Sequence, residues 1–326
     1  MRTPLARGPI SEAVIGVVRG RQPMGHSVSQ AIADSPDPLS DSDLQLALAV
    51  SYELNYGGFV DEVGEPEWDE TQLALRRQLE TAFACALHST VQQPTPSEEP
   101  VARQLRRVVE GTPGPPLSSF LQRTATASHY RDLLTQRAVY HLREADAHTW
   151  GIPRLRGRAK SALVEIQLDE YGSGVPGRAH AALFAATMRQ LGLDDTYGAS
   201  WDVAFAETLA ANNLMSFFGL HRKHVAALAG HLAALELTST VPNRRYAAGL
   251  RRLGFGADAT AFFDEHVVAD ALHEQVAAVD LCGSLVRDDP GALGDVLWGA
   301  AACVELDARA SHALFRRWQS SSVGAA

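Results

Sequence analysis

Apolar residues recur every three or four positions along most of this 326-residue chain. Within residues 68–91, Leu75, Leu79, Phe83 and Leu87 follow at four-residue intervals, which places them on one face of an α-helix. No segment shows the sustained alternation that is typical of a β-strand. We therefore predict an all-α fold whose helix lengths suit a bundle. The expected helices cover 40–59, 68–91, 101–111, 118–148 (one or two helices), 158–172, 178–192, about 202–238, 244–253, 258–287 and 290–317.

Breaks in this pattern divide the chain into three parts. Residues 1–38 are rich in Pro, Gly, Ser and Arg, which predicts a flexible N-terminal tail. The stretch QQPTPSEEP at 92–100 is typical of a linker, so we expect 39–100 to form N-terminal helices packed on a helical domain at 101–320. Within that domain, VPNRR at 241–245 predicts a turn after a long, apolar and therefore central helix.

The composition narrows the classes of function. A formal net charge of −9 argues against a nucleic-acid partner, which would need a long basic surface. The three cysteines lie far apart and form no CxxC motif, which favours a reducing compartment and argues against a thiolate zinc or iron–sulfur site. No apolar run reaches the roughly 20 residues that a membrane span needs, and the N-terminus lacks the apolar core of a signal peptide. We expect a cytoplasmic protein.

The stretch DEHVVADALHEQ at 264–275 carries the first candidate chemistry. An α-helix turns about 100° per residue, so His266, Asp270 and His273 project from one stripe of the predicted helix. Imidazole nitrogens and a carboxylate oxygen suit Fe, Mn or Zn. The motif alone is not decisive, because a half-exposed helix also carries polar residues at this spacing.

Four further residues stand where they could complete a metal site. Glu236 lies in the apolar central helix, and a buried carboxylate needs a partner such as a cation. Glu170 and His180 are ten residues apart, and the Gly- and Pro-rich stretch 172–177 between them would let them converge from two short segments. Glu144 is a weaker candidate, because a glutamate in a helical turn is usually solvated.

These residues together resemble the ligand set of the haem-oxygenase-like diiron oxidases, or iron-containing redox enzymes, and most of all their N-oxygenating branch. The separations of 26, 10, 56, 30, 4 and 3 residues match that branch. The stretches YELNYGGF, IPRLRGRAKSALVEIQLDEYGSG and HLAALELTS also look like the family, and the resemblance covers roughly 45–318. Asn55 departs from it, because relatives often carry His there. The candidate metal ligands are Glu144, Glu170, His180, Glu236, His266, Asp270 and His273.

The resemblance implies a haem-oxygenase-like helical bundle, here with extra N-terminal helices, that binds two iron ions. It implies O2 as co-substrate, a peroxo-diferric intermediate, and oxygen transfer to the nitrogen of a small-molecule amine, guanidine or amino-heterocycle in natural-product biosynthesis. Electrons must come from an external donor, because the chain shows no flavin or nicotinamide fingerprint. A homodimer is compatible with this bundle type. The expected ligand sets are Glu170, His180 and His273 for one iron, Glu144, His266 and Asp270 for the other, and Glu236 as a bridge.

Two alternatives stay open on the sequence. The same metal site could carry out oxidative C–C cleavage, decarboxylation or desaturation of an amino or fatty acid, as relatives in this superfamily do. A non-catalytic metal-binding or metal-free helical protein is the other alternative. Glu144 favours N-oxygenation, because the extra carboxylate marks that branch. Ferritin-type storage is disfavoured, because paired ExxH motifs are absent.

Other histidines have competing interpretations. His231 stands five residues before Glu236 and points about 140° away from it on a helix, so we expect a hydrogen-bonded core histidine. His148 follows Glu144 by one turn and could either orient a ligand or lie at the surface. His221 and His224 flank two basic residues and predict a basic turn near a surface or a pocket mouth.

Overall fold

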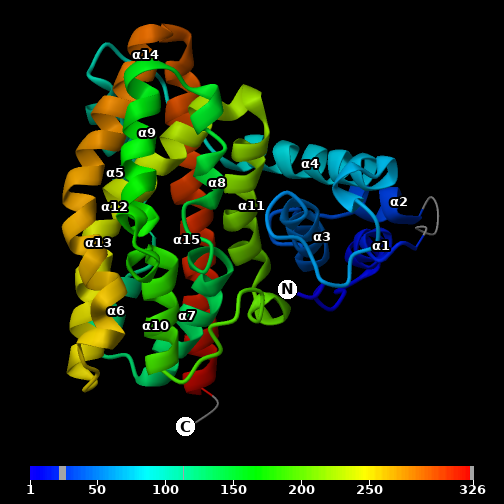
Figure 1. The fold of residues 1–326 in the computed structure, drawn as a ribbon, viewed down its shortest axis with the longest axis horizontal. Helices are drawn as coiled ribbons and strands as arrows, with labels where there is room; N and C mark the ends of the chain where they lie inside the picture. The colour runs from blue at the N-terminus through cyan, green and yellow to red at the C-terminus, as the bar shows by residue number, and fades with distance from the viewer. Residues whose placement is uncertain (22–26, 113, 324–326) are drawn as a thin grey trace.

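The structure is a computed structural model that describes residues 1–21, 27–112 and 114–323, without the side chains of Ser27, Asp270, Ala271 and 321–323. It confirms the all-α class, since the described residues contain no strand. A tall helical bundle lies beside a smaller group of N-terminal helices, and α11 stands between them (Figure 1).

The N-terminal unit consists of α1 (Pro9–Val18), α2 (Ser27–Ala33), α3 (Ser42–Glu53), the 3-10 helix η1 (Pro66–Trp68) and α4 (Glu70–Thr90). The predicted flexible tail is therefore wrong for the described residues of 1–38, while residues 22–26 lie outside the described part of the structure. The short apolar run in α1 buries Ile10, Val14 and Val18 in the same core cluster as α3 and α4. The carboxylate of Asp43 in α3 accepts hydrogen bonds from the backbone N–H groups of Ile10 and Ser11, both at 2.8 Å, and so satisfies the first turn of α1.

The bundle contains the remaining elements. Its α-helices are α5 (Val101–Gly111), α6 (Leu117–Arg123), α7 (Ala127–His141), α8 (Asp146–Thr149), α9 (Gly157–Glu170), α10 (His180–Gln190), α11 (Ala206–Leu220), α12 (Val225–Arg252), α13 (Ala257–Gln275), α14 (Ser284–Asp288) and α15 (Leu293–Val323). A π-helix, η7 (Val276–Gly283), joins α13 to α14. The 3-10 turns are η2 (Ile152–Arg154), η3 (Gly172–Gly174), η4 (Pro176–Arg178), η5 (Trp201–Val203), η6 (Arg222–His224) and η8 (Pro290–Ala292).

Two predicted boundaries in the middle of the chain are wrong. The expected single helix over 202–238 is two helices, because η6 separates α11 from α12. The expected turn at 241–245 does not form, and Pro242 lies inside α12. A proline inside a helix costs about 3 kcal/mol. Burial continues on both sides of it, from Glu236 to Tyr246, so packing against the bundle outweighs the lost hydrogen bond.

Helix α12 is central, and it packs against α5, α6, α13 and α15. Two glycines let α12 and α15 approach closely: a Cβ on Gly230 would overlap the carbonyl oxygen of Val296, and one on Gly299 would overlap that of Ala227. By length and composition alone, residues 222–252 could cross a membrane, but 56% of the most apolar window is buried inside the bundle. It is the core helix that its apolar surface predicts.

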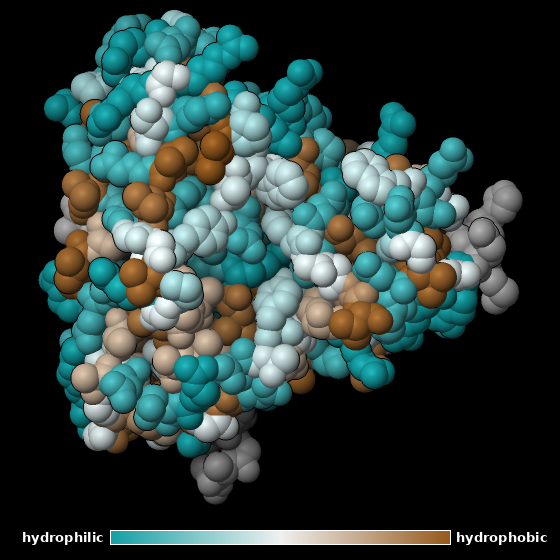
Figure 2. Space-filling view, viewed as in Figure 1, coloured by the Kyte–Doolittle hydropathy of each residue, from teal (hydrophilic) through white to brown (hydrophobic). Residues whose placement is uncertain are grey.

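The surface over α9 and α13 is more apolar than much of this face of the molecule (Figure 2). Val164 and Leu168 of α9 and Val268 and Leu272 of α13 are exposed there. The buried sides of the same two helices carry three of the candidate ligands, Glu170, His266 and His273.

Candidate metal centre

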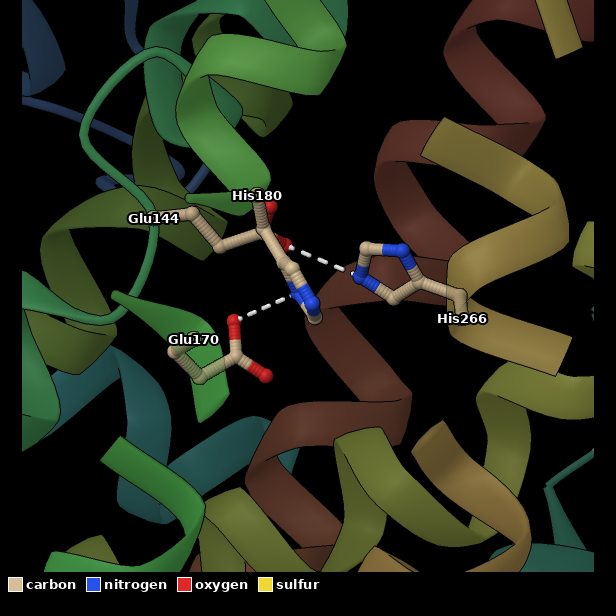
Figure 3. Close-up of side chains that lie close together, drawn as sticks. All are labelled: Glu144, Glu170, His180 and His266. Atoms are coloured by element: carbon tan, nitrogen blue, oxygen red, sulfur yellow. Dashed lines mark ion pairs between the residues drawn. The ribbon is translucent and has the colours of Figure 1, made fainter. Parts of the chain in front are cut away.

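The candidate ligands come from five places in the bundle. Glu170 ends α9 and His180 begins α10, as the Gly- and Pro-rich break between them predicts. Their contact is close, with His180 Nδ1 2.9 Å from Glu170 Oε2 (Figure 3). Gly172 makes the break possible, because its φ is +74° and a Cβ there would overlap the backbone of Ala179. Glu236 lies within α12, His266 and His273 lie on α13, and Glu144 lies in the turn between α7 and α8.

The first ligand group consists of Glu144, Glu170, His180 and His266. All four are buried, and each offers one ligand atom within 4.8 Å of the others. His266 Nε2 lies 3.6 Å from Glu144 Oε1, and the rings of His180 and His266 have centroids 4.4 Å apart. Four residues from four segments therefore converge on one small volume (Figure 3).

The second ligand group consists of Glu170, Glu236 and His273, also buried and within 4.8 Å of one another. His273 Nδ1 lies 3.6 Å from Glu236 Oε2 and 3.9 Å from Glu170 Oε1. Glu170 belongs to both groups, so the two groups adjoin.

This grouping differs from the expected pairing of ligands in two respects. His180 lies with Glu144 and His266 instead of with His273, and Glu170 instead of Glu236 is the shared carboxylate. The side chain of Asp270 lies outside the described part of the structure. The other six candidates are brought together.

The donor atoms of both groups fit a metal. Glu144 Oε2 and His273 Nδ1 are buried without a hydrogen-bond partner, and Glu170 Oε2 and His180 Nδ1 contact each other at 2.9 Å. An unsatisfied buried polar group costs roughly 1–3 kcal/mol, so a cluster of them is expensive unless a cation satisfies it. Carboxylate oxygens mixed with imidazole nitrogens are the donor set of non-haem iron sites.

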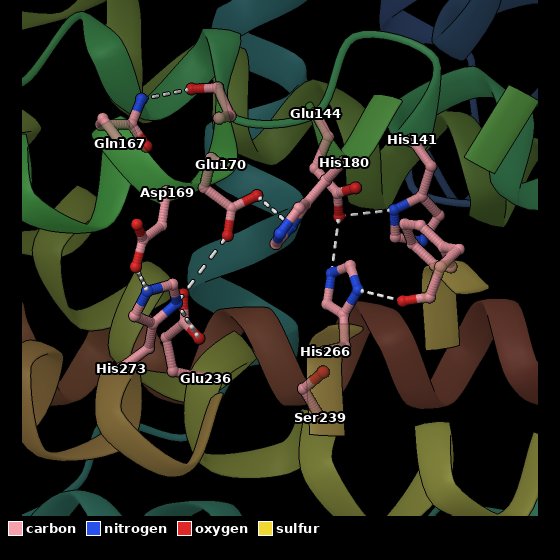
Figure 4. A network of polar contacts seen from close by, with 12 residues as sticks. His141, Glu144, Gln167, Asp169, Glu170, His180, Glu236, Ser239, His266 and His273 are labelled. Carbon is pink, nitrogen blue, oxygen red and sulfur yellow. Dashed lines mark hydrogen bonds and ion pairs between the residues drawn. The ribbon is translucent and has the colours of Figure 1, made fainter. Parts of the chain in front are cut away.

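Three contacts orient these ligands (Figure 4). His141 Nδ1 donates to Glu144 Oε1 at 2.7 Å, and His273 Nε2 donates to Asp169 Oδ2 at 3.2 Å. His266 Nδ1 donates to the carbonyl oxygen of Phe262 at 2.8 Å, so in the neutral ring the lone pair is on Nε2, the atom that faces Glu144. Such contacts fix the tautomer and the ring orientation of a metal-binding histidine.

Sequence reasoning missed Asp169 and His141. His141 stands three residues before Glu144, a spacing at which side chains on a helix meet, so a signal for it existed. Asp169 directly precedes Glu170, but its contact with His273 spans 104 residues of sequence. The packing of α9 against η7, which continues α13, brings the two together.

Burial and neighbouring charges both change the pKa values of the candidate ligands, and the outcome differs from residue to residue. Burial raises the pKa of Glu236. Burial also opposes ionisation of Glu144, but the His141 and His266 imidazoles outweigh it and lower the pKa of Glu144. For His273, burial lowers the pKa, but Glu236 and Asp169 outweigh it and raise the pKa to about 9. A proton therefore holds the place of a cation at His273 in the metal-free protein.

The remaining histidines take structural positions. His231 is buried and shares a hydrogen bond with His148, with 3.2 Å between Nδ1 and Nε2, which confirms the expected hydrogen-bonded core histidine. His148 is also buried, so its surface interpretation is wrong. His221 is half-buried in the turn before α12 and lies 2.9 Å from Glu80 of α4.

A cavity of about 390 Å³ adjoins the ligand groups. Glu144, Glu170, Glu236 and His266 line it, and a volume of this size holds a small molecule. Its other walls come mainly from α7, α11, α12 and α15, and include Gln136, Tyr140, Asn212, Leu232, Phe262 and Leu306.

Comparison with known proteins identifies the family. A family model described as iron-containing redox enzyme matches residues 131–308, more than half of the chain. The chain belongs to the iron-containing redox enzyme family. The expected family and the haem-oxygenase-like all-α fold are thereby confirmed.

The iron-containing redox enzyme match also covers both ligand groups. A relative, the nitrosourea synthase of Streptomyces achromogenes subsp. streptozoticus, is 30% identical over 155 residues, which are 47% of this chain and 33% of the relative. The chain thus aligns with about a third of that longer protein. This relative supports the expected N-oxygenating branch. The helices α1 to α6 precede the matched family region.

Proposed function

We propose that this iron-containing oxidoreductase is an O2-dependent, non-haem diiron N-oxygenase that oxidises the nitrogen of a small-molecule amine, guanidine or amino-heterocycle. One observation carries the proposal: two buried groups of carboxylate and imidazole donors adjoin through the shared Glu170. Two adjoining groups of this composition suit two iron ions better than one. The product would be a hydroxylamine, nitroso or nitro compound, in a natural-product pathway.

Each side chain has a part in this proposal. Glu144, Glu170, His180 and His266 would hold one ion, and Glu170, Glu236 and His273 the other, with Asp270 of the HxxxDxxH motif as a further ligand. When bound, ferrous ions supply the electrons that activate O2. His141 and Asp169 orient Glu144 and His273. The bundle excludes bulk water, because the ligands are buried, and the adjoining cavity receives the substrate.

The partners follow from the same chemistry. The proposal needs an external reductant or reductase to return the irons to the ferrous state between turnovers. It includes no nucleic-acid and no membrane partner. A homodimer is compatible with it but not required.

Glu144 supports N-oxygenation over the alternatives. Oxidative cleavage, decarboxylation or desaturation would use the same metal site, but the extra carboxylate marks the N-oxygenating branch, and Glu144 lies in the first ligand group. The relative's name, nitrosourea synthase, agrees with nitrogen chemistry in that protein. A non-catalytic protein has no need for a cavity of about 390 Å³ against its metal ligands.

The test is an anaerobic Fe(II) titration followed by mixing with O2. We expect two irons per chain and a transient visible absorption band on O2 addition. Incubation with 18O2 and a panel of 2-aminoimidazole, arylamines and arginine derivatives should then place labelled oxygen on nitrogen, as read by mass spectrometry. Iron binding with O2 consumption but labelled C–C cleavage products would favour the second reaction class. Absence of iron binding would contradict both.

A further inference from the structure

Glu144 lies on an unusual piece of backbone. Helix α7 ends at His141 and α8 begins at Asp146, so the residues between them form a turn. The next residue, Ala145, has φ +76° and ψ −24°, a left-handed conformation that side chains with a Cβ rarely adopt. Such conformations persist only where the surroundings hold them, and they gather at functional sites.

Two side chains hold this turn in place. Gln167 Nε2 of α9 donates to the carbonyl oxygen of Ala145 at 2.8 Å. Arg143 Nη1 donates to Glu53 Oε2 at 3.2 Å, and the Arg143 guanidinium lies 4.1 Å from the ring centre of Tyr56. Glu53 and Tyr56 belong to the N-terminal unit. The turn that carries Glu144 is therefore tied to a part of the molecule outside the matched family region.

The ion pair between Glu53 and Arg143 is unusually buried. The Glu53 side chain is fully buried and that of Arg143 is 8% exposed. Tyr197 donates a second hydrogen bond to Glu53 Oε2 at 2.7 Å. Buried charges of this kind are expensive to desolvate and add little net stability, so a specific positional role is a reason to keep them.

Arg143 and Glu144 are neighbours in sequence with different partners. Arg143 contacts α3, whereas Glu144 contacts His141 and His266 in the first ligand group. If Glu53 were neutral, Asp146 would be the carboxylate that acts most strongly on the Arg143 guanidinium, and Asp146 begins α8 at the far end of the same turn. A guanidinium that moved towards Asp146 would change the conformation of residues 142–145 and with it the position of Glu144.

We propose that Glu53 is a positioning residue for the metal centre: through its ion pair with Arg143, the N-terminal unit holds the turn that presents Glu144 and sets the metal affinity of the first ligand group. This inference rests on the proposed function, because it takes Glu144 as a ligand. It assigns the N-terminal helices a part in the site instead of a separate role.

The experiment measures anaerobic Fe(II) affinity and stoichiometry in the full chain with Glu53→Gln. We expect a loss of about 10- to 100-fold in affinity at one of two irons, which is typical of residues that orient metal ligands. Glu53→Asp, which keeps the charge, should restore most of the affinity. The visible spectrum of the Co(II)-substituted protein should change in the Gln variant, since it reports the coordination and not the stability.

Glu80→Gln is the matched control. Glu80 is also a buried carboxylate of the N-terminal unit, and it also reaches the bundle, through His221 at 2.9 Å. Its ion-pair partners, Arg76 and His221, both lie outside the turn at 142–145, so its variant should lose stability but keep both iron affinities. Equal losses of affinity in the Glu53 and Glu80 variants would reduce Glu53 to a general structural role and overturn the inference.

A double-mutant cycle separates this inference from the function on which it rests. In a Glu144→Gln background, Glu53→Gln should cause no further loss of affinity, because both act through the same carboxylate. If Glu144→Gln lowers iron affinity and Glu53→Gln does not, the ligand assignment stands and the positioning role fails. If Glu144→Gln leaves both irons unchanged, the assignment of Glu144 fails, and the positioning role with it. Should Glu53→Gln not fold, Arg143→Lys tests the same pair.

Discussion

The bundle buries two kinds of histidine, and their pKa values lie on opposite sides of neutral pH. His148 and His231 share a hydrogen bond, and burial lowers the pKa of His148 to about 4. His273 is as deeply buried, but Glu236 and Asp169 outweigh burial and raise its pKa to about 9. A buried histidine alone is thus a neutral core residue. Carboxylates that face it make the same side chain a place for positive charge, either a proton or a metal ion.

The ligand groups differ from the histidine pair in what they leave unsatisfied. The pair contains two imidazoles and no carboxylate. The groups contain three carboxylates, Glu144, Glu170 and Glu236, and one buried oxygen of Glu144 has no hydrogen-bond partner. The comparison therefore predicts that substitutions in the groups change metal binding, and that substitutions in the pair change stability.

Glu170→Ala should have the largest effect, because Glu170 is the carboxylate that both groups share. We expect loss of both irons and of all O2-dependent activity, with the helical circular dichroism spectrum retained. Metal analysis after anaerobic loading checks this. Retention of one iron at full affinity would show that the two groups do not share Glu170 when metal is bound.

Replacing one histidine of each group should remove one iron at a time. His266→Ala should remove the metal from the first group and His273→Ala from the second. Each substitution leaves all the donors of the other group in place. Iron stoichiometry should fall from two to one per chain in both variants, and the Co(II) spectra of the two variants should differ. Loss of both ions in either variant would mean that the sites fill only together.

Asp169→Asn should have a smaller effect on the second group. The amide keeps the shape of the side chain but not the charge that orients His273 through Nε2. Contacts of this kind are worth about 10- to 100-fold in metal affinity. We expect a loss in that range at one iron, with the other unchanged. Asp280→Asn is a suitable control, because Asp280 pairs with Arg158 on the surface nearby and contacts no ligand. An equal loss in both variants would indicate a general effect of surface charge.

The sequence predicts those contacts of the site that join residues close together along the chain, and it does not predict those that join distant helices. Spacing along one helix places His266 and His273 in adjoining groups, and the Gly- and Pro-rich break brings Glu170 to His180, as expected. Both relations are local, so periodicity and backbone chemistry suffice. Which candidate ligands fall into the same group depends on how α9, α10, α12 and α13 pack together. The spacing of residues along the sequence does not determine that packing.

The same limit explains the errors in the fold. The tail prediction overlooked α1, because eight of its ten residues are buried against a partner that only tertiary structure supplies. Pro242 predicts a turn by its local preference, yet the buried side chains around it continue α12. The predicted boundaries at 39–100 and 101–320 remain predictions. The ion pair between Glu53 and Arg143 nevertheless joins the two parts at the site.

The last prediction concerns the histidine pair and acid. The pKa of His148 falls from about 6.5 in an unfolded chain to about 4 in the fold, so protonation favours unfolding. Its contribution to stability is complete above about pH 6.5 and is lost as the pH falls towards 4, on the order of 3 kcal/mol for a shift of this size. Thermal unfolding of the metal-free protein between pH 7 and 4 measures this loss. A His148→Gln variant should unfold at a lower temperature at pH 7, with a shallower acid dependence and unchanged iron stoichiometry. If that variant instead lost iron, His148 would belong with the ligands, and the distinction between the two kinds of buried histidine would fail at this residue.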